Sequence, residues 1–205
     1  MTQDAFEKPW HGLESERTPA LALANTLDWR LRKEPIDLLK SYSDLVRWAR
    51  SVGAVEPAEA RALRKWGEEH PTAAARVLAE AIKLREAMAA IAASLIRGRA
   101  PQAAAIARLE AACRAAHASR VLQPTTAGAR WAWREDLDPQ RPLWAAALDA
   151  ERILTSDEAG HVRQCGDAEC GWFFVDRSRA QKRRWCSMEA CGNRNKARRF
   201  YSRQK

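Results

Sequence analysis

Four cysteines near the C-terminus constrain this chain more than any other feature of its sequence. Cys165 and Cys170 are separated by four residues, and Cys186 and Cys191 repeat this spacing after a further fifteen residues. Two closely spaced pairs allow two tight turns to present four thiolates to one tetrahedral Zn²⁺ ion. Four thiolates leave no open coordination position. The spacing therefore predicts one structural zinc ion, not a catalytic one, with these four cysteines as the candidate ligands.

Other cysteine chemistries fit the sequence less well. The first ten residues, MTQDAFEKPW, contain neither a basic nor an apolar stretch, so we expect no secretion signal, a cytoplasmic protein and no disulfides. A redox Cys-x-x-Cys motif is absent, and no apolar run approaches the length of a membrane span. The fifth cysteine, Cys113, falls on the apolar face of an Ala-rich segment and is expected to be a core thiol.

Most of the net positive charge lies in the same C-terminal segment. The chain has 35 Lys and Arg against 26 Asp and Glu, a net charge of +9, and residues 161–205 carry twelve against four, or +8. A balanced body with a strongly basic end is typical of a nucleic-acid-binding appendage. Nine of these twelve cations are Arg, whose guanidinium binds phosphate in a bidentate manner. We therefore predict two domains, residues 1–160 and residues 161–205.

Ten cations of the second domain are the candidate contacts to nucleic acid. Five lie in and after a predicted turn, and five lie on a predicted last helix. They are Arg177, Arg179, Lys182, Arg183 and Arg184, and Arg194, Lys196, Arg198, Arg199 and Arg203. Phosphate contacts do not distinguish the two nucleic acids, and no base-reading pattern is visible. We favour DNA, with RNA and an acidic protein partner as the alternatives.

The predicted local structure of the second domain is a treble-clef-like zinc finger. Residues 172–175 and 183–186 are expected to pair as a β-hairpin around the turn 176–182, and a helix is expected to follow Cys191. The aromatic residues available for its small core are Trp172, Phe174, Trp185, Phe200 and Tyr201. Most of them are expected to serve as core, since so small a domain needs its apolar side chains.

The body is predicted to be mainly helical with one small β-hairpin, an α+β arrangement. Apolar spacing and the helix-starting prolines 19, 57, 71 and 142 predict helices over 20–33, 44–52, 58–69, 71–97, 102–119 and 143–154. Ser43 is the expected N-cap of the second helix, and Gly53 its C′ residue. Residues 120–123 and 129–134 are expected to form the hairpin, with Trp131 and Trp133 on one face.

A role of its own is expected for the body, either as a ligand sensor or as a dimerisation module. Aromatic walls with cationic edges suit a small anionic or aromatic ligand, and the candidate pocket residues are Trp29, Arg30, Arg130, Trp131 and Trp133. Ordinary core packing is the competing interpretation. No nucleophile elbow, Gly-rich phosphate loop or paired His-Glu metal motif is present, so no enzymatic activity is expected.

The C-terminal segment resembles the CGNR zinc finger family, which is named for the tetrapeptide found here at residues 191–194. The Phe-x-Asp-x-Ser turn at 174–178, the Trp-Cys-Ser-Met run at 185–188 and the Arg-rich end match the family pattern. The resemblance implies that Cys165, Cys170, Cys186 and Cys191 are zinc ligands. The body resembles the ABATE domain that usually precedes this finger, on the order of its elements and on Leu-Ala-Asn-Thr at 23–26. Together they imply a transcription regulator of bacterial type, with a helical domain that contains a small sheet.

Overall fold

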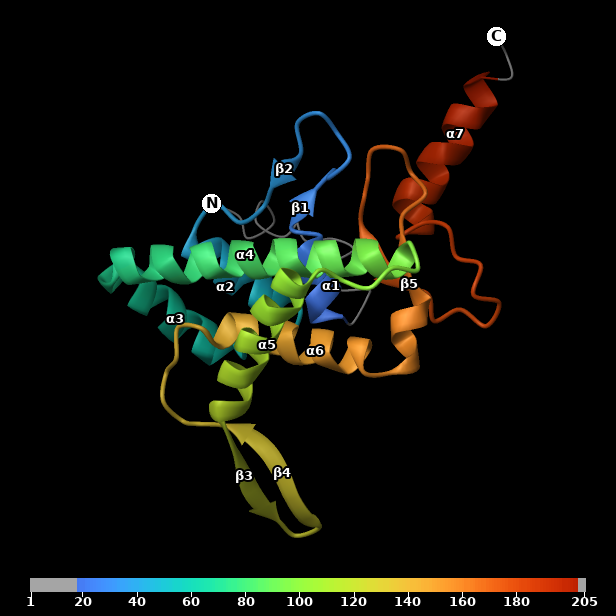
Figure 1. Cartoon of the computed structure of the whole chain (residues 1–205). Helices are drawn as coiled ribbons and strands as arrows, with labels where there is room; N and C mark the ends of the chain where they lie inside the picture. The colour runs from blue at the N-terminus through green and yellow to red at the C-terminus, as the bar shows by residue number, and fades with distance from the viewer. Residues whose placement is uncertain (1–17, 203–205) are drawn as a thin grey trace.

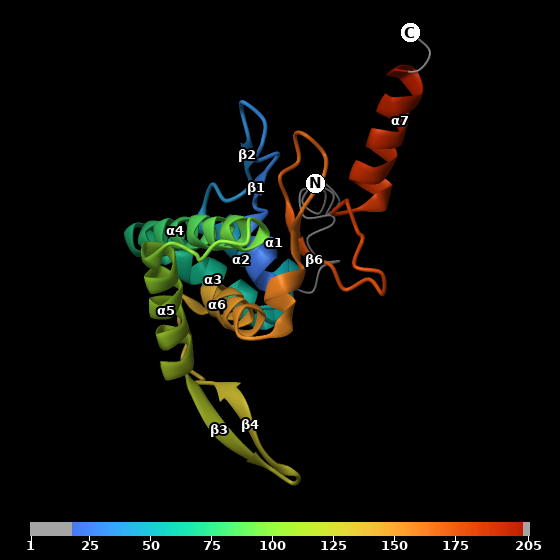
Figure 2. The same ribbon diagram turned by 45° about the vertical axis from the view of Figure 1, so that its right-hand side comes forward.

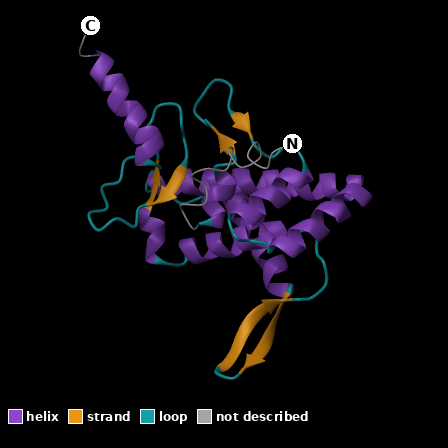
Figure 3. Ribbon diagram, turned by 180° about the vertical axis from the view of Figure 1, so that it is seen from behind, coloured by secondary structure: helices purple, strands orange, loops and turns teal. Residues whose placement is uncertain are grey.

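The computed structural model describes residues 18–202, which are mainly helical with small two-stranded sheets (Figures 1 and 3). The α-helices are α1 (Pro19–Ala24), α2 (Tyr42–Ser51), α3 (Pro57–Glu69), α4 (Pro71–Ile96), α5 (Ala103–Ala118), α6 (Arg141–Leu154) and α7 (Asn193–Ser202). A 3-10 helix, η4 (Asp157–His161), and a π-helix, η5 (Met188–Gly192), complete the helical elements of the described residues. The predicted fold class is confirmed.

The strands pair as three antiparallel hairpins. β1 (Leu27–Asp28) pairs with β2 (Ile36–Asp37), β3 (Arg120–Thr125) with β4 (Gly128–Trp133), and β5 (Val162–Gln164) with β6 (Phe173–Val175). The predicted hairpin after α5 is therefore present. It extends away from the helices, and its Leu122 and Trp131, which face each other across the strands, are 59% and 52% exposed (Figures 1 and 2). Arg120 lies over the rings of both Trp131 and Trp133, which places the two tryptophans on one face as predicted.

The core is built around α1, which packs between α4 and α6 (Figure 1). Ala20 to Ala24 are all buried, since leucines and alanines alternate along this short helix and the neighbouring helices cover it on both sides. The apolar stripe predicted along α4 forms one wall of this core, with Ala81, Leu84 and Met88 each at most 3% exposed. Cys113 of α5 is buried as expected.

The first helix is much shorter than predicted. It ends at Ala24, where the Thr26 hydroxyl donates to the Leu23 carbonyl oxygen at 2.7 Å. Trp29 then adopts a φ of +53°, which is outside the helical region, and the chain turns back through β1 and β2. The predicted continuation to residue 33 is wrong, and Leu31 is 50% exposed instead of lying on a helix face.

Most other helix boundaries follow the predicted signals. Pro57 and Pro71 begin α3 and α4, and Gly53 follows α2 with a φ of +70°. The N-cap of α2 is Ser41 and not Ser43, since the Ser41 side chain accepts from the Asp44 amide at 3.1 Å. Among the described residues, no helix has both the length and the apolar composition that crossing a lipid bilayer requires.

Candidate metal centre and basic surface

The four cysteines meet at one point although they come from two separate turns. Cys165 and Cys170 delimit a turn between β5 and β6, here called the knuckle (residues 165–170), while Cys191 lies in η5 immediately before α7. All four are buried, and their sulfur atoms lie within 4.8 Å of one another. The Cys170–Cys186 and Cys186–Cys191 sulfur separations are 3.7 and 3.6 Å. Four thiolates about 2.3 Å from a tetrahedral zinc ion lie about 3.8 Å apart, so the cluster fits zinc.

The electrostatics of the cluster favour a bound cation. Hydrogen bonds with Cys165 and Cys170, together with burial, raise the pKa of the Cys186 thiol, whereas hydrogen bonds from Cys170 and Cys186 lower the pKa of Cys165. Four buried thiolates repel one another, and a divalent ion offsets that repulsion.

The finger has a different hairpin from the one predicted. β6 pairs with β5, and residues 183–186 form no strand. The buried Asp176 carboxylate folds the intervening loop by accepting from the Ser178 amide at 3.0 Å and from the Arg183 amide at 2.9 Å. The knuckle is thus the connection within the hairpin and does not precede it, whereas the second cysteine pair lies at a helix start as predicted.

Arg194 supports the metal centre from outside it. Its Nη2 donates to the Cys191 sulfur at 2.9 Å, and its Nε donates to the Asp167 carboxylate at 3.0 Å. Asp167 is 1% exposed and also accepts from the Asn195 amide at 2.7 Å. The Arg194 guanidinium lies 4.4 Å from the centre of the Trp29 ring. Arg194 therefore connects the candidate metal ligand Cys191 with Asp167 of the knuckle and with Trp29 of the body.

We expect Arg194→Ala to weaken zinc binding by about 10- to 100-fold, the usual effect of removing a partner of a metal ligand. Competition with a colorimetric chelator measures this affinity. Arg199→Ala is the matched control, since Arg199 is exposed on the same helix and has no ion pair within residues 18–202. Equal zinc affinities of the two variants would contradict the role given to Arg194.

The finger and the body are joined by buried hydrogen bonds. The Asn25 side chain accepts from the Phe173 amide at 2.8 Å and donates to the Phe173 carbonyl oxygen at 2.9 Å. The Asp28 carboxylate accepts from the Trp172 indole at 2.8 Å. Val162, Phe173 and Val175 belong to the same core as the helices. Residues on both sides of position 160 thus share one core.

The knuckle itself pairs with the turn between β1 and β2. The Arg30 amide donates to the Cys170 carbonyl oxygen at 3.0 Å, and the Leu31 amide donates to that of Glu169 at 3.3 Å. Gly171 has a φ of +74°, and a Cβ there would lie 2.9 Å from Leu31 Cγ. Only glycine permits this close approach.

The ten predicted nucleic-acid contacts fall into three groups. Arg177, Arg183, Arg194 and Arg198 are engaged within the protein, for example Arg177 with Glu158 at 3.0 Å and Arg198 with Glu169 at 3.5 Å. Arg203 lies outside the described residues. The remaining five are exposed and have no ion-pair partner within residues 18–202. We call them the cationic surface: Arg179, Lys182, Arg184, Lys196 and Arg199.

The aromatic residues of the finger divide between core and surface. Phe174 is fully buried, and Trp172 and Trp185 pack against the cysteine cluster. Phe200 and Tyr201 are 60% and 66% exposed, so their predicted core role is wrong. They miss the core because α7 runs outward from the hairpin (Figure 1) and buries none of its residues.

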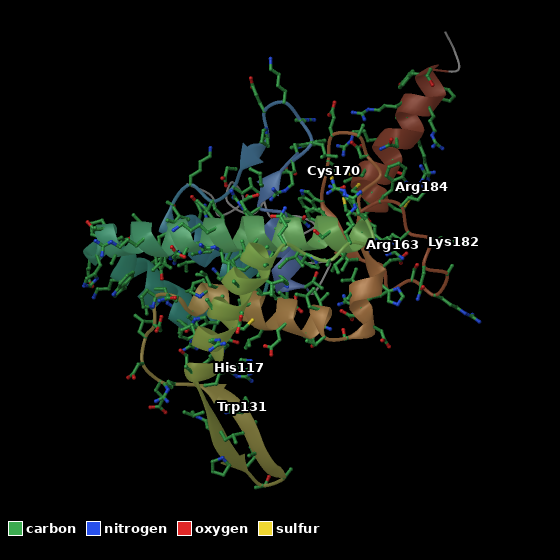
Figure 4. The ribbon with its side chains drawn as sticks, viewed as in Figure 1. His117, Trp131, Arg163, Cys170, Lys182 and Arg184 are labelled. Atoms are coloured by element: carbon green, nitrogen blue, oxygen red, sulfur yellow. The ribbon has the colours of Figure 1, made fainter. Side chains whose placement is uncertain are left out.

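The five predicted pocket residues do not form one pocket. Trp29 and Arg30 lie at the β1–β2 turn beside the finger, whereas Arg130, Trp131 and Trp133 lie on the β3–β4 hairpin at the far side of the helices, where Figure 4 labels Trp131. The structure does not bring the five residues together, because the chain leaves α1 at Ala24 and turns back through the β1–β2 hairpin, which is separate from the β3–β4 hairpin. Arg32 stacks on Trp29 at 3.5 Å, and Trp133 packs on Trp144 at 5.3 Å.

A different hollow in the body was missed by the sequence interpretation. A cleft of about 330 Å³ lies where α2, α3 and α4 meet, and Lys40 and Arg64 are among its lining residues, together with Ser41 and Tyr42. Its volume is close to the lower end of the range for small-molecule sites. Nothing in the periodicity pointed to it, because three helices contribute to its walls.

Comparison with known families matches both parts of the chain. A family model described as "Putative stress-induced transcription regulator", the ABATE family, matches residues 17–157. A second model, the CGNR zinc finger, matches residues 161–204. No curated protein matches the chain. The two families occur in the predicted order, and their descriptions are of a regulator and a zinc finger and not of enzymes.

Proposed function

Because this chain belongs to the ABATE family and ends in a CGNR zinc finger, we propose that it is a transcription regulator that binds DNA through the finger. The single observation that carries the proposal is the cationic surface. Its five charges lie on one small module, are exposed and are not neutralised by carboxylates within the described residues. Figure 4 labels Lys182 on the loop that reaches the outer edge of the finger, away from the helical body. Phosphate groups are the partner that such a surface suits.

The salt dependence of binding tests this proposal. If all five cations contact phosphates of duplex DNA, log K falls against log salt with a slope of about −4.5. Replacing Arg179, Lys196 and Arg199 with Ala should flatten that slope by about 3 and weaken binding at low salt. The matched control removes the same charge from the body through Arg61→Ala, Arg76→Ala and Arg99→Ala, all exposed positions. Fluorescence anisotropy over a salt series measures both, and equal slopes in the two triple variants would contradict the proposal.

RNA is the alternative ligand, because cations that contact phosphates do not distinguish a ribose, with its 2′-hydroxyl, from a deoxyribose. Protein purified after nuclease treatment should be offered genomic DNA fragments and total RNA, each as competitor of the other. Preferential retention of RNA would replace DNA in the proposal. Binding of neither at about 50 mM salt, where the electrostatic contribution is strong, would favour an acidic protein partner.

We further propose that the helical body regulates the finger, by sensing a small molecule or by forming a dimer. The cleft between α2, α3 and α4 supports the first form, because its lining has two cations, Lys40 and Arg64, against one carboxylate, Glu68, and this balance suits an anion. The exposed Leu122 and Trp131 support the second. Thermal-shift screening of the full chain against anionic metabolites tests the first, with Arg64→Ala as the variant that should lose the response. Sedimentation velocity tests the second, with Trp131→Ser as the variant.

A further inference from the structure

The loop before the second cysteine pair and the start of η5 enclose a hollow on the finger. Its volume is about 260 Å³, and it is lined by Lys182, Arg183, Arg184, Trp185 and Met188. It lies just below the ~300 Å³ at which drug-sized sites begin, which suits a ligand of about the size of one nucleotide. Three cations, one indole and one thioether form its walls, and none of the lining residues is acidic.

The indole in this hollow is held rigidly by the metal centre. Trp185 packs against the cysteine cluster and remains half-buried. It lies between two glycines, since a Cβ on Gly166 would be 3.3 Å from the six-membered ring and a Cβ on Gly192 would be 3.3 Å from Cδ1. A Cβ on Gly192 would also lie 2.7 Å from the Met188 sulfur, so this glycine lets Met188 pack beside Trp185. A ring fixed in this way loses little further freedom when a ligand stacks on it.

The three cations of the hollow differ in whether they are bonded within the finger or exposed. Arg183 is engaged within the finger, where its Nε donates to the Trp185 carbonyl oxygen at 2.8 Å and its guanidinium lies 4.4 Å from the centre of the Phe174 ring. Arg184 lies 5.2 Å from the centre of the Trp185 ring, and Lys182 is exposed. Lys182 and Arg184 are therefore the two exposed cations of the hollow that are not held in an ion pair within the described residues, and both can reach phosphates next to a flat group placed on the indole.

We propose that this hollow binds one unpaired base of a nucleic acid, stacked on Trp185 beside Met188, with the adjoining phosphates on Lys182 and Arg184. Fixed aromatic surfaces flanked by cations are how proteins hold single strands, whereas the base faces of an intact duplex are covered by their neighbours. The inference rests on the proposed nucleic-acid binding and adds to it a preference for unpaired over paired nucleic acid. The finger binds single-stranded or locally unpaired segments more tightly than duplex of the same sequence.

The test compares a fluorescent twelve-nucleotide oligothymidine with a duplex of the same length. Trp185→Leu should weaken binding of the single strand by about 5- to 150-fold, which corresponds to the loss of one stacked base, and should change duplex binding by less than about twofold. Trp185→Phe keeps an aromatic face and should retain most of the affinity. Trp66→Leu, which removes a half-buried tryptophan from α3 in the body, is the matched control and should change neither. Zinc content, measured by elemental analysis, reports whether each variant retains the folded finger.

Photo-cross-linking keeps the proposal testable if Trp185→Leu fails to fold. Wild-type protein irradiated with a 5-iodouracil oligonucleotide should be labelled on the peptide that contains Trp185. Labelling confined to other peptides overturns the inference, as does a zinc-loaded Trp185→Leu with unchanged affinity for the single strand. Steep salt-dependent binding to duplex in preference to the single strand overturns this inference alone, and binding to neither overturns the proposed function with it.

Discussion

A variant with Cys186→Ser and Cys191→Ser will contain no zinc and will lose the cooperative unfolding transition of the whole protein, not of the finger alone. A structural zinc site contributes about 10–16 kcal/mol of apparent binding free energy, comparable with the ~5–15 kcal/mol by which a typical protein is stable. Without the ion, the knuckle loses the order that places the Cys170 and Glu169 carbonyl oxygens against the β1–β2 turn. Val162, Phe173 and Val175 then lose their fixed places in the core of the helices.

Elemental analysis and circular dichroism melting measure this result. Cys113→Ser is the matched control, because Cys113 is a buried cysteine that does not belong to the metal cluster. Its sulfur donates to the Ala147 carbonyl oxygen at 3.4 Å, and a serine hydroxyl can make the same hydrogen bond. That variant should keep one zinc ion per chain and a single transition. A metal-free double variant that melts as the wild type does would show that the body folds without the finger, as two independent domains would.

Asn25→Ala will lower the melting temperature by roughly 5–20 °C without touching a metal ligand. The substitution leaves the buried amide and carbonyl of Phe173 without their partner, at a cost of about 1–3 kcal/mol for each group. For a chain of about 200 residues, each kcal/mol corresponds to about 2–4 °C.

Differential scanning calorimetry measures the shift. Asn193→Ala is the matched control, since Asn193 is an exposed asparagine of the finger and should change stability by no more than about 0.5 kcal/mol. Similar melting temperatures for the two variants would show that the link between Asn25 and Phe173 contributes little to folding.

The metal centre could be predicted because its signal is local. Two cysteines five positions apart specify a turn by themselves, and the sulfur cluster then needs only the pairing of two such turns. Helix starts were predictable for the same reason, since Pro57 and Pro71 act on their own backbone. The family resemblance, carried by short contiguous motifs, was confirmed on both parts of the chain.

The predictions that were wrong or missing concern residues whose partners are distant in the sequence. The end of α1 is determined by Asn25 and Thr26, and Asn25 is engaged with a strand 148 positions later. The strand that pairs with β6, Val162–Gln164, is short, and its burial comes from the helices behind it. Arg194 looked like one more basic residue of a helix, and only the positions of Cys191, Asp167 and Trp29 distinguish it from Arg199.

The hydrogen bonds between Asn25 and Phe173 also fix an order of events while the chain is being made. A ribosome adds about 5–20 residues per second, so a separation of 148 residues delays the arrival of Phe173 by about 7–30 s. During that interval the side-chain amide of Asn25, at the end of α1, has no partner, while α2 to α6 are synthesised one after another. Cys191, the last ligand, emerges later still. The core around the first described helix is therefore closed only when the finger has been synthesised, so a nascent chain stalled before the knuckle presents an incomplete fold to chaperones and proteases.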